Sequence, residues 1–140
     1  NHNGHQEVVL VEYDNEKISY SKLLRSYWRN IDPFDSAGQF CDRGDSYKPV
    51  IFFSNDNQFN EATSTSNKAA NELSVLEDKI AVLIQPAKMF WQAEDYHQDY
   101  AQMNSLKYNF YRYSCGRDKR LEEVWGDNSQ SETDWKNAKD

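Results

Sequence analysis

The sequence predicts one domain in which helices and strands form layers, of the α/β or α+β class. Three short runs rich in Val, Ile and Leu have the length of buried strands, and two segments with helical spacing of apolar residues separate them. Strand and helix therefore alternate along the chain, as they do in layered folds. Three strands are few for a sheet that is covered on both faces, so we expect further structure to complete it.

The first strand is predicted in "EVVLVEYD", residues 7–14, whose continuous apolar run indicates burial on both faces. Residues 14–16 have turn composition. A helix should then begin after Ser19 as its N-cap and end before Pro33. Its apolar positions share one face, and they are Tyr20, Leu23, Leu24, Tyr27, Trp28 and Ile31.

Residues 33–47 are predicted to be a loop, because Pro, Gly, Ser and Asp dominate them. The length of this loop suggests a functional role. A second strand is predicted at Lys48–Phe53, and a mostly exposed helix with Ser54 or Asn55 as its cap should follow.

The third strand is predicted at Lys79–Pro86. Residues 108–126 are aromatic and basic and should wrap the surface of the domain. We place the domain at residues 1–125 and expect residues 126–140 to be a solvated tail.

The composition excludes several classes of function. The net charge of −7 leaves no basic surface for a phosphate backbone, so we expect no nucleic-acid partner. No apolar run approaches the roughly 20 residues of a membrane span, so we expect no membrane partner. The two cysteines do not make a disulfide scaffold, and they suit redox chemistry or a reducing compartment such as the cytoplasm.

Three polar residues suggest a binding site for an oxygen atom. Glu7 begins a buried strand, and Asp42 and Tyr47 lie in the long loop. A carboxyl at the mouth of an apolar pocket can act as a general acid, and a phenol can donate a hydrogen bond to an oxygen that carries negative charge. Capping and turn roles are the alternative for all three residues.

Other motifs carry weaker signals. His2 and His5 could supply two metal nitrogens, but no second motif provides the remaining ligands, and we predict no metal site. Residues 43–46 read "RGDS", which adhesion ligands share and which turns also favour. His97 is expected to brace the last helix together with its acidic neighbours.

Several ordered stretches give the chain a family resemblance. They are "GHQEVVLVEYDNEKISYSKLLRSYW", "DP", "DRGDSYKPVIFF" and "AEDYHQDY". In that order they resemble the A-type peptide methionine sulfoxide reductases over roughly residues 4–100. The resemblance implies an α+β two-layer sandwich with a ferredoxin-like core, of which this stretch lacks the first strand–helix–strand segment.

The resemblance also implies a reaction. Enzymes of this family reduce the S-epimer of methionine sulfoxide, free or in proteins, without a cofactor. A thiolate attacks the sulfoxide sulfur, a second cysteine captures the resulting sulfenic acid, and thioredoxin restores the thiols. Carried over to this chain, Glu7 is the proton donor, Asp42 and Tyr47 bind the sulfoxide oxygen, and Gly4 and His5 edge the substrate pocket.

The sequence departs from the family at the nucleophile. The family carries its reactive cysteine in a Gly-Cys-Phe-Trp motif before the Gly-His-x-Glu strand, and the 140 residues contain no such motif. We therefore expect that this chain is truncated at its N-terminus and is inactive by itself. The alternative is a naturally shortened relative that binds methionine sulfoxide or a protein without turnover.

Neither cysteine replaces the missing nucleophile in this interpretation. Cys41 neighbours Asp42 and is expected to be a small buried side chain. Cys115 lies where the family often keeps its resolving cysteine, so it is a candidate for that role. The glycine-rich surroundings that would give it mobility are absent, since "RDKRLEEVW" follows Gly116.

Overall fold

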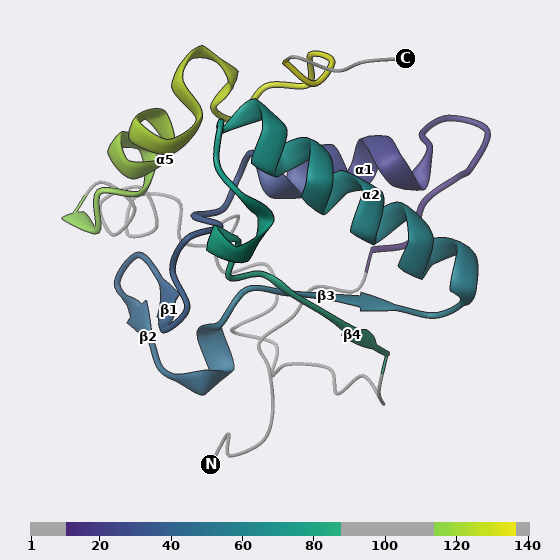
Figure 1. Cartoon of the computed structure of the whole chain (residues 1–140), viewed down its shortest axis with the longest axis horizontal. Helices are drawn as coiled ribbons and strands as arrows, with labels where there is room; N and C mark the ends of the chain where they lie inside the picture. The colour runs from purple at the N-terminus through teal and green to yellow at the C-terminus, as the bar shows by residue number, and fades with distance from the viewer. Residues whose placement is uncertain (1–10, 88–113, 137–140) are drawn as a thin grey trace, which may run out of the picture.

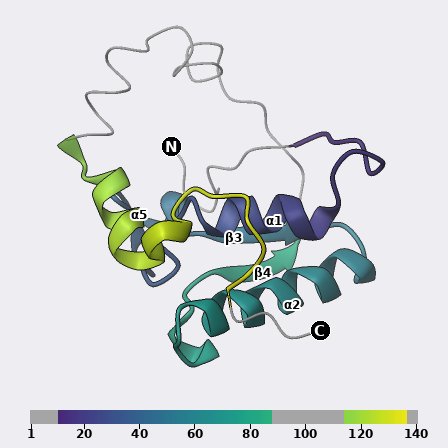
Figure 2. The same ribbon diagram turned by 90° about the horizontal axis from the view of Figure 1, so that it is seen from above.

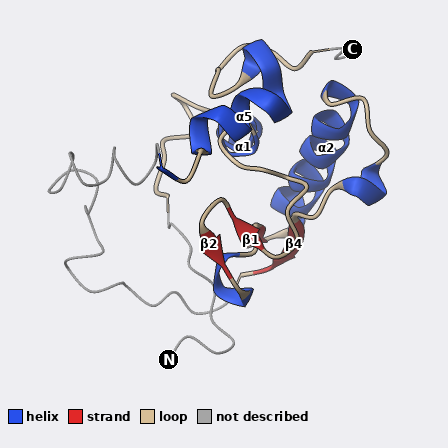
Figure 3. Cartoon of the chain, turned by 90° about the vertical axis from the view of Figure 1, so that its left-hand side faces the viewer, coloured by secondary structure: helices blue, strands red, loops and turns tan. Residues whose placement is uncertain are grey.

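The computed structural model describes residues 11–87 and 114–136. Within them, two helices lie on one side of a two-stranded parallel sheet, and a third helix closes one end of this arrangement (Figures 1 and 3). The predicted α+β class is confirmed, with helices and sheet in two layers. In this part of the chain, no helix is long and apolar enough to cross a bilayer.

Helix α1, Tyr20–Trp28, follows the predicted turn and carries the predicted cap. The carbonyl of Asp14 accepts hydrogen bonds from the amides of Lys17 and Ile18, and the Ser19 hydroxyl accepts one from the Lys22 amide at 3.2 Å. The helix ends earlier than its apolar pattern suggested. The amide of Ile31 bonds the Trp28 carbonyl three residues back, which tightens the last turn before the chain leaves the helix.

Strand β3, Val50–Phe53, helix α2, Asp56–Glu72, and strand β4, Leu83–Pro86, form a parallel crossover unit. Val50 pairs with Leu83 at one end of the ladder and Phe53 pairs with Pro86 at the other. A parallel pair needs a long connection, and α2 supplies it. Both strands begin two or more residues later than predicted, and a 3-10 turn, η2 at Glu77–Lys79, precedes β4.

Helix α2 packs against α1 through small side chains. The amide of Gln58 donates to the Asn55 side chain at 2.9 Å, which confirms the predicted helix start. Phe59, an aromatic residue of the first turns of this helix, is exposed. The buried face of α2 consists instead of small side chains, which let the backbones of α1 and α2 approach closely. The small buried residues of α2 are Ala62, Thr65, Ser66, Ala69 and Ala70.

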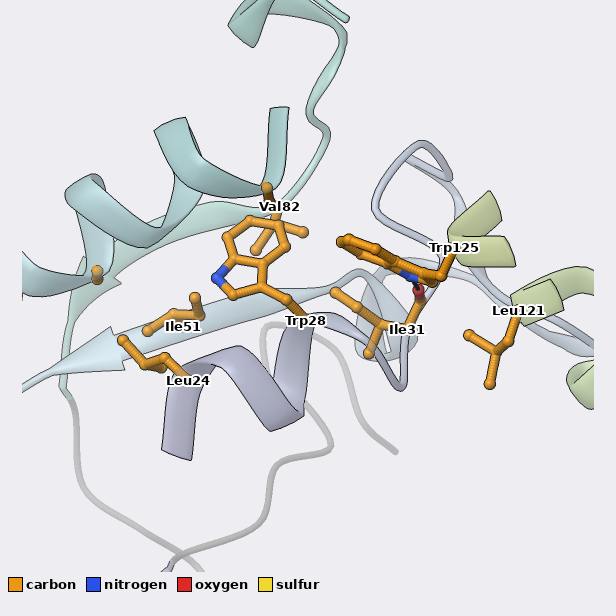
Figure 4. Close-up of a cluster of buried hydrophobic side chains, with 9 residues drawn as sticks. Leu24, Trp28, Ile31, Ile51, Val82, Leu121 and Trp125 are labelled. Atoms are coloured by element: carbon orange, nitrogen blue, oxygen red, sulfur yellow. Dashed lines mark hydrogen bonds between the residues drawn. The ribbon is translucent and has the colours of Figure 1, made fainter. Parts of the chain in front are cut away.

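The core lies between α1, α2 and the β3–β4 sheet (Figure 4). Trp28 is fully buried, and its indole nitrogen donates to the Thr65 hydroxyl at 3.0 Å, which satisfies its only polar atom. Figure 4 shows Ile31 next to the indole of Trp125, with the indole of Trp28 beside them. Each large side chain buried here contributes roughly 1.5–3 kcal/mol to folding.

Helix α5, Arg117–Trp125, is part of this core, whereas the sequence predicted a surface wrap for residues 108–126. Leu121 is fully buried, and the Trp125 indole donates to the Ile31 carbonyl at 2.9 Å. Charged residues surround these two anchors in the sequence and conceal them in its pattern.

The segment after α5 passes over α1 toward α2 (Figure 2). Its side chains are largely exposed, and its backbone is hydrogen-bonded to the domain at several points up to residue 136. The buried Arg29 guanidinium donates to the carbonyls of Ser131, Thr133 and Asp134. It also pairs with the buried Glu72 carboxylate at 2.7 Å. Residues 126–136 are therefore docked on the domain.

Candidate active site

The candidate site is centred on the predicted loop, which is a compact hairpin. Strands β1, Gly38–Gln39, and β2, Asp42–Arg43, pair antiparallel, and a 3-10 turn, η1 at Asp45–Tyr47, follows them. Phe40 and Cys41 make the two-residue turn, and Phe40 has a φ of 54°. Positive φ is what tight hairpin turns require.

Gly38 is the residue that lets the two hairpin strands approach. A Cβ atom at this position would overlap the carbonyl oxygen of Asp42 and lie 3.0 Å from the Cα of Arg43. The Gly44 amide closes the other end of the hairpin by donating to the Ala37 carbonyl at 2.9 Å. Backbone contact therefore fixes the position of Asp42.

Asp32 anchors the start of the loop. The Asp32 amide donates to the side-chain oxygen of Gln39 at 2.9 Å, and the side-chain nitrogen of Gln39 donates to the Asp32 carbonyl at 2.7 Å. Its buried carboxylate accepts from the Phe34 amide at 3.1 Å and from the Arg120 Nε of α5 at 2.8 Å. The hydrogen bond to Asp32 raises the pKa of Arg120.

A second ion pair braces the outside of the hairpin. Arg43 donates to both carboxylate oxygens of Asp35, at 2.5 and 2.9 Å. These hydrogen bonds lower the pKa of Asp35, which stays ionised at neutral pH. Arg43 and Asp45 belong to the "RGDS" sequence, and Asp45 pairs with Lys48 at 3.0 Å. Both charged groups of the motif thus have partners within the loop.

Asp42 and Tyr47 lie in this hairpin unit, and both are half-buried. The amide of Tyr47 donates to the Gly44 carbonyl at 3.1 Å in the turn that follows β2. The fold thus holds both residues on one compact unit. Such a pair suits the binding of a polar oxygen atom.

The structure joins Cys115 to this unit. Its sulfur forms a disulfide with Cys41, across 74 residues of sequence and with 5.3 Å between the Cα atoms. Cys41 is exposed, so the expectation of a small buried side chain is wrong. Sequence reasoning missed this bond because neither cysteine has a local pattern that identifies its partner.

Several predicted site residues lie outside the described part of the chain. They are Gly4, His5, Glu7, His2 and His97. Three residues of the predicted site are described: Asp42 lies in β2, Tyr47 lies in the turn that follows it, and Cys115 is bonded to Cys41 in the hairpin turn. Among residues 11–87 and 114–136, no group of three or more His, Cys, Asp or Glu side chains could hold a metal ion.

Comparisons with known proteins relate this chain to one family. A family model described as peptide methionine sulfoxide reductase matches residues 1–129. A Caulobacter vibrioides protein named peptide methionine sulfoxide reductase MsrA 2 is 48% identical over 123 residues, which cover 88% of this chain and 61% of that protein. A Vibrio cholerae protein named MsrA/MsrB is 40% identical over 88% of this chain and 32% of its own length.

A solved structure shares the fold. The reduced form of Mxr1 from Saccharomyces cerevisiae superposes with a TM-score of 0.61 and 30% sequence identity, over 66% of this chain and 50% of that one. The chain thus spans less than two thirds of the length of the Caulobacter relative and half of the yeast structure.

Proposed function

This chain belongs to the A-type peptide methionine sulfoxide reductases, and from that premise we propose that it forms the oxygen-binding side of a site that reduces methionine sulfoxide to methionine. The observation that carries the proposal is the cross-linked hairpin of residues 32–47. It holds Asp42 and Tyr47 on one unit, in the stretch where the family resemblance assigns oxygen binding.

The proposed chemistry begins with the sulfoxide oxygen. The Tyr47 phenol donates a hydrogen bond to this oxygen, and Asp42 contributes to the same binding site. Glu7 delivers the proton as a thiolate attacks the sulfoxide sulfur, and Gly4 and His5 edge the substrate pocket. The oxygen is thereby transferred to the attacking sulfur as a sulfenic acid, and methionine leaves.

The nucleophile of this reaction is proposed to come from sequence outside these residues. No Gly-Cys-Phe-Trp motif occurs among the 140 residues, and the chain spans 61% of its Caulobacter relative. Cys115 is the proposed resolving thiol, and thioredoxin is the proposed reductant. The proposed substrate is the S-epimer of methionine sulfoxide, either free or in oxidised proteins. The proposed location of this repair activity is the cytoplasm.

A thioredoxin-coupled assay with methyl p-tolyl sulfoxide tests the proposal. The enzyme that contains this chain together with its nucleophile should turn over, and the 140-residue chain alone should not. Glu7→Gln should lower kcat by roughly 10²–10⁴-fold, because the proton donor is lost. Turnover by the chain alone would contradict the external nucleophile, and an inactive complete protein that still binds the sulfoxide would favour the binding relative.

Tyr47→Phe tests the oxygen-binding role by removing a single hydroxyl. We expect a loss of roughly 10²-fold in kcat, the range seen when one donor to a developing oxyanion is removed. Tyr13→Phe is the matched control, because Tyr13 lies outside the hairpin and stacks on Tyr20 instead. Equal activities of these two variants would remove Tyr47 from the mechanism.

A further inference from the structure

Helix α5 and the β1–β2 hairpin lie at the same end of the molecule, although they are far apart in sequence (Figure 1). Two arginines of α5, Arg117 and Arg120, contact the hairpin or the residue at its base. Residues three positions apart are neighbours on the surface of a helix, so one face of α5 supplies both contacts. This face is therefore turned toward the unit that carries Asp42 and Tyr47.

Arg120 contacts the base of the hairpin through Asp32. Its Nε atom donates to one carboxylate oxygen of Asp32 at 2.8 Å, and its Nη2 atom lies 3.5 Å from the other oxygen. The Asp32 side chain is buried, and its carboxylate also accepts from the Phe34 amide. The backbone of Asp32 is bonded in turn to the side chain of Gln39 in β1. Arg120 is therefore connected through one carboxylate to both β1 and the start of the loop.

Arg117 contacts the tip of the hairpin. Its guanidinium carbon lies 4.4 Å from the centre of the Phe40 ring, which is within the range of a cation–π interaction. Phe40 is a residue of the hairpin turn, and its side chain also packs against the hydrophobic core. The turn is therefore held by the core and by α5 together.

The charges at the base of the hairpin act on one another. Arg43, which directly follows Asp42, pairs with Asp35 across the loop. The hydrogen bonds from Arg43 lower the pKa of Asp35, and the more distant charge of Arg120 lowers it further. Arg120 therefore favours the ionised form of the carboxylate that holds β2 in place.

Helix α5 is itself fixed to the core. The side chains of Leu121 and Trp125 are buried, and the Trp125 indole donates to the carbonyl of Ile31, the residue before Asp32. Buried side chains in a close-packed core keep one arrangement. The two arginines of α5 thus extend toward the hairpin from a helix whose own position is fixed.

We propose that Arg117 and Arg120 are positioning residues that set the places of Asp42 and Tyr47 in the sulfoxide site. They act through the tip and the base of the hairpin rather than on the substrate. This inference rests on the proposed function, because it matters for catalysis only where the hairpin binds the sulfoxide oxygen. It adds α5, a helix that carries neither of the two oxygen-binding residues, to the parts of the fold that determine the rate.

Reduction of methyl p-tolyl sulfoxide by the enzyme that contains this chain together with its nucleophile tests the effect on the rate. Arg120→Gln should lower kcat roughly tenfold, since a misplacement of about 1 Å can cost on the order of 10²-fold. KM should stay unchanged, because the oxygen gains its negative charge only in the transition state. Arg120→Lys should recover part of the loss, because an ammonium group can still donate to Asp32.

Lys119→Gln is the matched control, because it makes the same charge change at an exposed position of α5. Its kcat should equal that of the unsubstituted enzyme. Arg117→Gln is a second test variant, and its kcat should fall in the same direction as that of Arg120→Gln. An active enzyme in which Arg120→Gln and Lys119→Gln have the same kcat would overturn the proposal.

Hydrogen exchange tests the position of the hairpin without a sulfoxide. It is measured in a Cys41→Ser background, so that the disulfide cannot hold the hairpin in place of the arginines. Arg120→Gln should speed exchange of the Phe34 and Gly44 amides about two- to fivefold, the range expected for one partly exposed charge interaction. The amides of α2 should keep their rates, whereas a general loss of stability would speed both groups.

The two measurements separate this inference from the proposed function. If the complete enzyme does not reduce the sulfoxide, the proposed function fails, and the exchange rates still decide whether α5 holds the hairpin. If the enzyme is active but Arg120→Gln changes neither kcat nor the exchange of the Phe34 and Gly44 amides, the positioning role fails and the proposed function stands.

Discussion

Glu72→Gln should be strongly destabilising, because Glu72 is the counter-charge of a fully buried arginine. The side chains of Arg29 and Glu72 are 0% and 2% exposed, respectively. The Glu72 carboxylate accepts hydrogen bonds from Arg29 Nε at 3.1 Å, from Arg29 Nη2 at 2.7 Å and from the Lys136 amide at 2.6 Å. Glutamine offers one acceptor oxygen and turns an NH₂ group toward donors.

The expected cost follows from these contacts. Removing one partner of a buried ion pair costs about 3–5 kcal/mol, since the other charge stays buried. Arg29 keeps its bonds to the carbonyls of the docked C-terminal segment, which places the expected loss near the lower end, at about 3 kcal/mol. This is a large share of the roughly 5–15 kcal/mol that stabilises a typical domain.

Equilibrium urea unfolding measures this loss, and the midpoint should fall by about 1–2 M. The matched control is Asp45→Asn, the same carboxylate-to-amide change in an ion pair whose Asp45 side chain is 89% exposed. It should cost less than about 1 kcal/mol. Hydrogen exchange gives a second readout, because the Lys136 amide loses its acceptor and should exchange faster. Losses in the two variants that agree within about 1 kcal/mol would refute the reasoning.

Three further changes test other parts of the structure. Gly38→Ala should lower reductase activity at least tenfold by displacing Asp42, and a kinetic assay that finds wild-type activity would show that the hairpin tolerates the added Cβ. Burial raises the pKa of the Tyr27 phenol from about 10 to about 12, so the folded protein holds the phenol proton more tightly than the unfolded chain does. The free energy of unfolding should therefore fall as the pH rises from about 10 to about 12. Tyr27→Phe should flatten the decline of the melting temperature between about pH 10 and 12, and an unchanged slope would contradict the shift. Trp28→Phe should cost about 2–3 kcal/mol in urea unfolding, since it removes buried area and the bond to Thr65, whereas a loss below about 1 kcal/mol would contradict tight packing there.

The local signals in the sequence predicted the elements well where one short segment decides the outcome. Ser19 and Asn55 are caps because a side-chain oxygen near the next turn is enough to start a helix. The alternation of strand, helix and strand around α2 predicted a layered fold, and in the structure these elements form a parallel crossover unit. The composition of residues 33–47 indicated a loop, but the sequence did not predict the pairing of Gly38 with Arg43. The paired strands have two residues each, which is too short for an alternation of apolar and polar residues.

For the candidate site as well, the sequence predicted some features and missed others. Motif order assigned Asp42 and Tyr47 to one site; β2 and the turn after it contain them, and their shared role stays a prediction. Glu7 lies outside the described residues and its role stays a prediction. The docking of α5 was missed, since its two buried anchors are separated by charged residues in sequence.

By itself, the sequence determined the family, the order of α1, β3, α2 and β4, and the residues that cap the two helices, because short motifs and local caps carry this information. Only the tertiary structure decided that Cys41 bonds Cys115 and that Arg29 holds the C-terminal segment. Both contacts join residues more than 70 positions apart. Such partners are chosen by the packing of whole elements against one another, which no local pattern of residues records.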